Sequence, residues 1–146
     1  MGYIIFLTSG HVAGEVKNAV PVYWRSAKIP RMVGSSFEAE AIALEEAVNV
    51  GYTIMKDLSA ITNIPEHMIK VEGICDADDV VKAVNNTTNT TKDRTSWEIG
   101  RMRQMQQKKE IWRVKWLEGK ENPADVLTKR GAPKHLMQRA LDHGMV

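Results

Sequence analysis

The spacing of apolar and polar residues changes several times along the chain, and each change predicts a new element. Tyr3–Leu7 is rich in β-branched and aromatic residues and ends in the turn-forming stretch Thr8–Gly10, so it predicts a strand. Val20–Ser26 predicts a second strand, and the polar stretch between the two predicts a hairpin with a long loop. Pro21 cannot donate to a ladder, which places this hairpin near a sheet edge.

Helical spacing begins near Ser35 and continues to about Thr62. Ser35 and Glu38 have the spacing of a capping box, and apolar residues then recur every three or four positions. Gly51 lies inside this span and weakens it as a helix. Asn63, two residues before a proline, ends it.

The second half of the chain alternates between strand and helix patterns. The predicted elements are a strand at Met68–Cys75, a short helix at Asp78–Val84, a polar loop at Asn85–Thr91, an amphipathic helix at Arg94–Lys109, a strand at Ile111–Glu118, a helical segment from Asn122 to Lys129 and a closing helix at Lys134–Asp142. An antiparallel hairpin followed by alternating strands and helices predicts an α/β fold, with a mixed sheet flanked by helices.

Length and composition are those of one globular domain. The chain has 146 residues, of which 43% are hydrophobic and 26% charged. No apolar run approaches the roughly 20 residues that a spanning helix needs, and no charged leader precedes an apolar run. Cys75 is the single cysteine, which excludes an internal disulfide and favours a reducing compartment. We therefore expect an intracellular protein, in the cytoplasm or a virus-like particle, with no membrane partner.

The net charge of +2 hides an uneven distribution. Residues 36–80 hold ten acidic residues and two lysines, whereas residues 101–116 hold six Lys/Arg and one Glu. An acidic region can bind metal and a basic region can bind a phosphate backbone. Solvated helix faces explain the charges just as simply, so the charge pattern alone decides nothing.

Three carboxylates are predicted to lie at the ends of elements. Glu40 lies in the first turns of the long helix, Asp76 follows a strand, and Asp125 lies in the first turn of a late helix. Such ends are where sites form in α/β layers. A carboxylate cluster is a hard-oxygen site that suits Mg²⁺ or Mn²⁺, and two such ions can drive phosphodiester hydrolysis.

Each of the three acids also has a purely structural explanation. Glu40 would be an ordinary exposed helix glutamate, since Glu38 fits the capping role better. Asp76 would be a turn residue before a helix that Asp78 or Asp79 caps. Asp125 would interact favourably with a helix dipole. Taken singly, none of them establishes a site.

Five stretches in order carry a family resemblance: GYIIFL (Gly2–Leu7), VYWRSAKIP (Val22–Pro30), SSFEAEAIAL (Ser35–Leu44), ICDADDVVKAV (Ile74–Val84) and ENPADVLTK (Glu121–Lys129). With them, residues 3–130 resemble the ribonuclease H region that ends copia-type retroelement polyproteins. Residues 131–146 resemble the helical tail of such polyproteins, so we expect one ribonuclease H-like domain over residues 1–146.

The resemblance implies a catalytic, metal-binding role for Glu40, Asp76 and Asp125. In the family, the complete carboxylate set hydrolyses the RNA strand of an RNA/DNA hybrid with Mg²⁺. The family's first metal aspartate lies on a central strand that precedes GYIIFL, and here GYIIFL follows Met1 directly. Reading Tyr3–Gly10 as that strand would offer only Ser9, which is no carboxylate. We therefore expect this chain to lack that strand and its aspartate.

The missing strand has a physical consequence, because it would leave unpaired edges in the sheet. Either the hairpin closes directly onto the later strands, or another chain or the reverse transcriptase domain supplies the strand. We expect the nuclease activity of this chain, taken by itself, to be impaired. The alternatives are a catalytically inactive nucleic-acid-binding or structural remnant of a retroelement, and an unrelated interaction domain whose acids are helix caps.

The predicted basic helix and the strand after it offer contacts for nucleic acid. The expected backbone contacts are Arg101, Arg103, Lys108 and Lys109. Trp112 and Trp116 fall on the same side of the predicted strand as Val114, so we expect them to pack in the core rather than stack on bases.

Overall fold

The computed structural model describes residues 1–9, 11–12, 15–16, 19–86 and 95–143. The chain forms two compact units, the first made of residues 1–28 and 120–146 and the second of residues 29–119. The single domain expected from the sequence stays a prediction. None of the helices in the described ranges has the length and apolar character needed to cross a bilayer.

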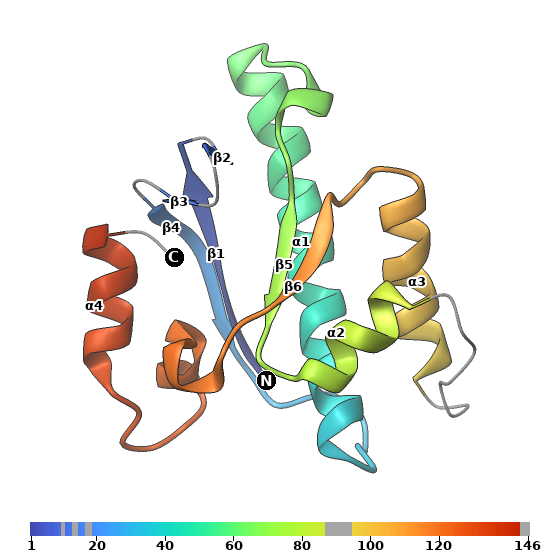
Figure 1. Cartoon of the computed structure of the whole chain (residues 1–146), viewed down its shortest axis with the longest axis vertical. Helices are drawn as coiled ribbons and strands as arrows, with labels where there is room; N and C mark the ends of the chain where they lie inside the picture. Colours follow the sequence, from blue (N-terminus) through green and yellow to red (C-terminus); the bar gives the residue numbers. More distant parts are fainter. Residues whose placement is uncertain (10, 13–14, 17–18, 87–94, 144–146) are drawn as a thin grey trace. The chain divides into compact units, whose positions relative to one another are not determined.

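The first unit is built on the hairpin of β1 (Gly2–Thr8) and β4 (Ala19–Ser26), which pair antiparallel as predicted (Figure 1). The loop between them carries a two-residue ladder of β2 (His11–Val12) and β3 (Glu15–Val16). The register shifts between Ile5 and Phe6, next to the position where Phe6 lies opposite Pro21. Such an irregularity accommodates a proline within a paired strand.

The rest of the first unit consists of short helical segments. After the 3-10 turn η2 (Gly119–Glu121) come η3 (Pro123–Leu127) and the helix α4 (Lys134–His143). The predicted segment from Asn122 to Lys129 is therefore a 3-10 turn that ends early, and the closing helix is confirmed. The Ser26 hydroxyl donates to the carbonyl oxygen of Leu127 at 2.7 Å, which fixes η3 to the end of β4.

The second unit begins with the long helix α1 (Ser36–Thr62), as predicted. The Ser35 hydroxyl accepts from the Glu38 N–H at 3.1 Å, but the Glu38 carboxylate accepts from the Gly34 N–H at 2.9 Å. The capping box is therefore half formed, because the Glu38 carboxylate binds the N–H of Gly34 instead of the N–H of the N-cap residue Ser35. Asn63 ends the helix in the left-handed conformation, with φ 58°.

In the rest of the second unit, both strands and the later of the two helices between them are shorter than predicted, whereas the earlier helix is one residue longer. The strands β5 (Glu72–Cys75) and β6 (Arg113–Trp116) pair in parallel, and β5 follows the 3-10 turn η1 (Glu66–Met68). The helices between the strands are α2 (Asp78–Asn85) and α3 (Ser96–Gln107). Most of the predicted loop after Asn85, together with Arg94, lies outside the described residues.

One apolar core joins these helices to the strands. Its buried members are Ala41, Leu44, Val48, Cys75, Val80, Val81, Ala83, Val84, Ile99, Met102, Met105, Ile111 and Val114. Gly73 lets α1 approach β5 closely, because a Cβ there would lie 2.9 Å from Cγ1 of Val48. Gly51 is tolerated within α1 for a similar reason, since Val71 Cγ1 lies 3.3 Å from the position of its Cβ.

The α/β class is confirmed: the described residues contain four α-helices with both antiparallel and parallel strand pairs. The described strands form separate two-stranded sheets, in which β1 pairs with β4 and β5 pairs with β6. A continuous mixed sheet would need a strand that pairs with the β1–β4 hairpin and also with the β5–β6 pair. None of the described strands does so.

Candidate functional site

Two of the predicted acids, Glu40 and Asp76, come together in the second unit. Glu40 lies near the start of α1, and Asp76 follows the last residue of β5, Cys75. One ligand atom from each of Glu40, Cys75 and Asp76 lies within 4.8 Å of the other two. Their proximity depends on the close packing of α1 on β5, which Gly73 permits.

The position of Asp76 is fixed by the end of β6. Trp116 Nε1 donates to the main-chain oxygen of Asp76 at 3.1 Å, and the Leu117 N–H donates to the carbonyl oxygen of Cys75 at 3.0 Å. A Cβ on Gly119 would lie 3.3 Å from the Asp76 carboxylate, so a larger residue there would crowd it. The carboxylate is therefore held beside Glu40 by the strand pairing itself.

Cys75 is the member of the cluster that the sequence did not predict. Its side chain is buried, and burial raises the pKa of the thiol to about 12, with the carboxylates of Glu40 and Asp76 contributing in the same direction. The thiol is therefore protonated at neutral pH and accepts from the Ala77 N–H at 3.4 Å. The sequence could have indicated Cys75 through its position directly before Asp76. The chain leaves the strand at this point, so the two adjacent side chains need not point to opposite faces of the sheet.

The donor chemistry suits a hard divalent cation. Two carboxylates supply the oxygen ligands that Mg²⁺ and Mn²⁺ prefer, whereas a protonated thiol is a poor ligand for Mg²⁺. Glu40 is exposed and Asp76 is half-buried, so an ion could reach both from solvent. Exposed acidic groups also occur without any ion, so the geometry permits a metal and does not require one.

Asp125 belongs to the first unit. It lies in the first turn of η3, as predicted, and its carboxylate accepts from Lys129 Nζ at 2.7 Å. Its main-chain oxygen accepts from the N–H groups of Thr128 and Lys129, so it has a local structural role as well. Its membership in a carboxylate cluster with Glu40 and Asp76 stays a prediction.

Neither Asp78 nor Asp79 occupies the N-cap position of α2, although the Asp79 carboxylate accepts from the Val80 N–H in the first turn at 2.9 Å. Ala77 is the N-cap of α2, with no side-chain cap hydrogen bond. Asp78 instead forms an ion pair with Lys82 at 2.5 Å, and both acids lie in the first turn, where the helix dipole favours negative charge.

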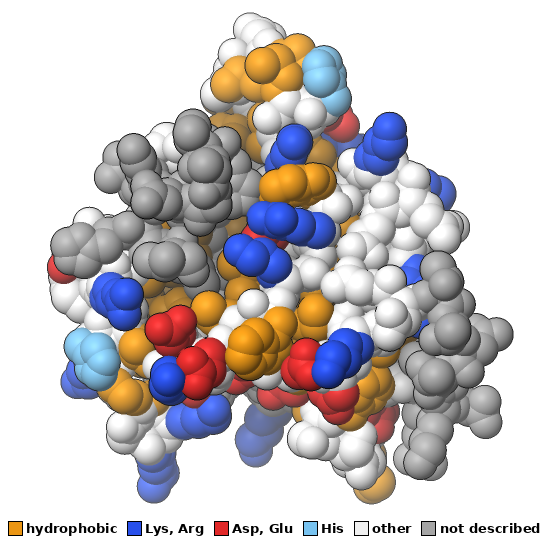
Figure 2. Space-filling model, viewed as in Figure 1, with side chains coloured by type: hydrophobic (Ala, Val, Ile, Leu, Met, Phe, Trp, Pro, Cys, Tyr) orange, Lys and Arg blue, Asp and Glu red, His pale blue; other side chains and the backbone are white. Residues whose placement is uncertain are grey.

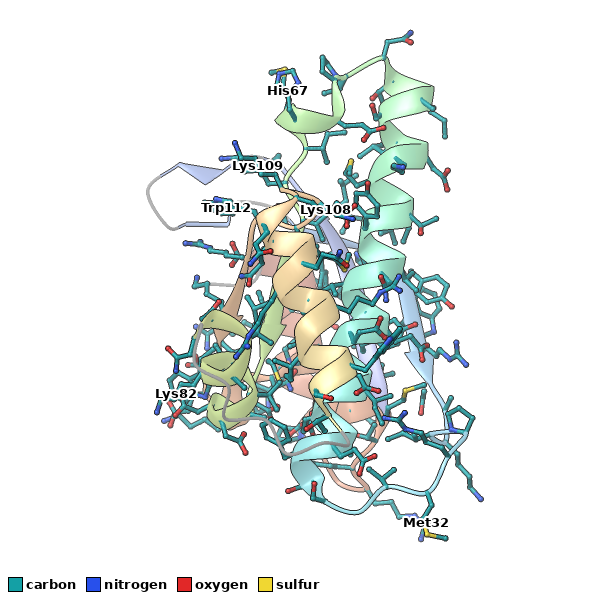
Figure 3. The ribbon with its side chains drawn as sticks, turned by 90° about the vertical axis from the view of Figure 1, so that its right-hand side faces the viewer. Met32, His67, Lys82, Lys108, Lys109 and Trp112 are labelled. Carbon is teal, nitrogen blue, oxygen red and sulfur yellow. The ribbon has the colours of Figure 1, made fainter. Side chains whose placement is uncertain are left out.

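The four predicted backbone contacts differ in their surroundings. Arg101 pairs with Glu45 at 3.0 Å on α1, and Arg103 donates from Nε and Nη2 to the Ala83 carbonyl oxygen at 3.0 and 2.6 Å. These arginines therefore tie α3 to α1 and α2. Lys108 and Lys109 are exposed at the C-terminal end of α3, beside Trp112 (Figure 3).

The prediction that Trp112 and Trp116 pack in the core is wrong. Val114 between them is 4% exposed, but Trp112 is 40% and Trp116 49% exposed. Val114 is the buried residue of the short strand β6, whereas Trp112 precedes the strand and Trp116 is its exposed last residue. Trp97, in the first turn of α3, is also exposed.

Comparisons with models of protein families, with curated proteins and with solved structures found no match. The family resemblance carried by the sequence motifs therefore stays a prediction. What the site can do follows from its own residues.

Proposed function

We propose that this chain is a ribonuclease H-like domain of a copia-type retroelement polyprotein, with a divalent-metal centre on Glu40 and Asp76. The supporting observation is that these two acids, from separate segments, place ligand atoms within 4.8 Å of each other. The stretches SSFEAEAIAL and ICDADDVVKAV, which carry the resemblance, contain these same two acids.

Glu40 and Asp76 would hold Mg²⁺ or Mn²⁺ through carboxylate oxygens. When bound, such ions supply an activated water and stabilise the leaving oxygen, here in hydrolysis of the RNA strand of an RNA/DNA hybrid. The contribution of the chain is preorganisation: Asp76 is anchored by Trp116, and Glu40 is carried by a helix packed on β5.

The carboxylate set of this chain is incomplete under this proposal. Asp125 is the proposed third ligand on the strength of the motif ENPADVLTK alone. The family's first aspartate has no counterpart within the 146 residues. We therefore propose that hydrolysis by these 146 residues alone is slow or absent.

The alternative, an inactive nucleic-acid-binding remnant, is favoured by a different observation. Exposed cations and an exposed indole lie together at the end of α3 and the start of β6, in Lys108, Lys109 and Trp112. That surface could bind nucleic acid without any metal.

The first experiment measures Mn²⁺ binding to the purified chain by calorimetry. We expect Asp76→Asn and Glu40→Gln each to weaken Mn²⁺ binding by roughly tenfold or more, because each removes one of the charged ligands. Asp57→Asn, which removes an exposed acid elsewhere on α1, is the matched control and should bind as the wild type does. Equal affinity in all four proteins would refute the metal centre.

Cleavage is measured separately, on a labelled RNA/DNA hybrid with Mg²⁺ or Mn²⁺. Activity above that of Asp76→Asn would support the nuclease. Equal background in both proteins, together with intact Mn²⁺ binding, would favour the inactive remnant.

A further inference from the structure

Trp112 lies at the centre of a basic surface in the second unit. Lys70 Nζ lies 4.6 Å and Arg113 Cζ 4.0 Å from the centroid of its ring, and the residue as a whole is 40% exposed. Lys and Arg side chains gather with hydrophobic ones over β5 and β6 (Figure 2). We call this region the Trp112 surface; it consists of Lys70, Glu72, Lys108, Lys109, Trp112, Arg113 and Lys115.

One acid, Glu72, contacts two of the cations of this surface. Glu72 accepts from Arg113 Nε at 2.8 Å and lies 3.8 Å from Lys115 Nζ. It holds the guanidinium of Arg113 against the indole, so the ring and the charge are positioned together. The surface has five basic residues and one acid, a net charge of +4 (5 − 1).

Lys109 adopts an unfavourable backbone conformation within this surface. Its φ is 60°, and the hydrogen bonds from Lys109 N–H to Gln106 and from Glu110 N–H to Met105 are those of a helix C-terminal turn. Glycine is usual at this position, and a side chain there costs about 1 kcal/mol. A lysine at this position therefore lowers stability relative to glycine.

We infer that the Trp112 surface binds single-stranded nucleic acid, with a base stacked on Trp112 and neighbouring phosphates held by the surrounding cations. Such binding combines a positively charged track with an exposed aromatic ring, and both are present here. Bases also stack on guanidinium planes, so the Arg113–Trp112 pair extends the platform. The inference goes beyond the proposed nuclease, since it uses neither Glu40 nor Asp76.

The indole distinguishes single strands from duplexes. The bases of a duplex are stacked on one another, so an exposed ring on a protein surface meets sugars, phosphates and base edges there but not the faces of the bases. An unpaired base can instead turn its face to Trp112. We therefore expect the surface to prefer unpaired strands over an RNA/DNA hybrid at equal salt.

The test measures binding of a fluorescein-labelled oligothymidylate and of an abasic oligonucleotide of equal length to the full chain. EDTA is present throughout, so failure of the metal centre does not affect the result. We expect the wild type to bind oligothymidylate about tenfold more tightly than the abasic strand, because one stacked base contributes on this scale. Both affinities should fall steeply with salt.

Variants separate stacking from charge. Trp112→Leu should lower oligothymidylate affinity to the abasic level, whereas Trp112→Phe should keep most of the preference. Lys109→Gly should weaken binding of both strands while the melting temperature stays the same or rises, because glycine relieves the strained φ. Lys82→Gln, which removes an exposed lysine on α2 (labelled in Figure 3), is the charge control and should bind as the wild type does.

Equal affinity for the two strands in the wild type would overturn the inference. Retention of the preference in Trp112→Leu, with normal unfolding of that variant, would also overturn it. Tighter binding of an RNA/DNA hybrid than of oligothymidylate would assign the surface to duplexes instead.

Discussion

At the scale of single residues, Gly73 decides how closely α1 and β5 approach each other. The position of a Cβ on Gly73 is 2.9 Å from Val48 Cγ1 and 3.4 Å from Leu44 Cδ1, both on α1. These side chains belong to the buried core and have little room to move. The same close approach brings Glu40 near Asp76. The packing of the core and the candidate site therefore both depend on the absence of a side chain at Gly73.

We predict that Gly73→Ala destabilises the protein by about 1–3 kcal/mol, because the added methyl overpacks the core. It should also weaken Mn²⁺ binding, since α1 must shift away from β5. Gly100→Ala is the matched control. The position of its Cβ on α3 has no atom within 4 Å, so alanine there should raise stability by about 0.5–1 kcal/mol through helix propensity. Urea unfolding measures both variants, and equal effects would contradict the packing argument.

At the scale of elements, one arginine joins the start of α1 to α3. Arg31 Nη2 lies 2.6 Å from Glu98 on α3 and 3.6 Å from Glu38 on α1. Both carboxylates are buried, and Glu98 Oε2 has no hydrogen-bond partner among the described residues. The cation therefore compensates two buried negative charges that would otherwise repel each other.

We predict that Arg31→Met destabilises the protein by about 1–3 kcal/mol. The loss should be smaller than that for breaking a fully buried ion pair, because Arg31 is half-exposed. Adding Glu98→Gln to that variant should recover part of the loss, because it removes one of the uncompensated charges. Lys82→Met breaks an exposed pair with Asp78 and should leave the unfolding midpoint unchanged. Additive effects of the Arg31 and Glu98 changes would show that the two residues are not coupled.

At the scale of the whole molecule, the three acids predicted from the sequence belong to two units. Glu40 and Asp76 belong to residues 29–119, and Asp125 belongs to the unit that contains residues 120–146. Within its own unit, Asp125 pairs with Lys129 at 2.7 Å. We predict that Asp125→Asn lowers the free energy of unfolding by less than about 1 kcal/mol, because the lysine of this pair is exposed. Urea unfolding measures the change, with Asp142→Asn, an exposed acid on α4 in the same unit, as the control. A loss above about 3 kcal/mol would contradict this local role.

The sequence by itself determined the order of the elements and the positions of Glu40 near a helix start, Asp76 after a strand and Asp125 in a first turn. These features depend on residues close in the chain, such as Ser35 at the start of α1 and Asn63 at its end. The tertiary structure decided what depends on distant contacts. It placed Cys75 beside the two acids, engaged Arg101 and Arg103 with neighbouring helices, and left Trp112 exposed. Alternation along a strand says which side a residue faces, whereas burial depends on how much of a four-residue strand its neighbours cover.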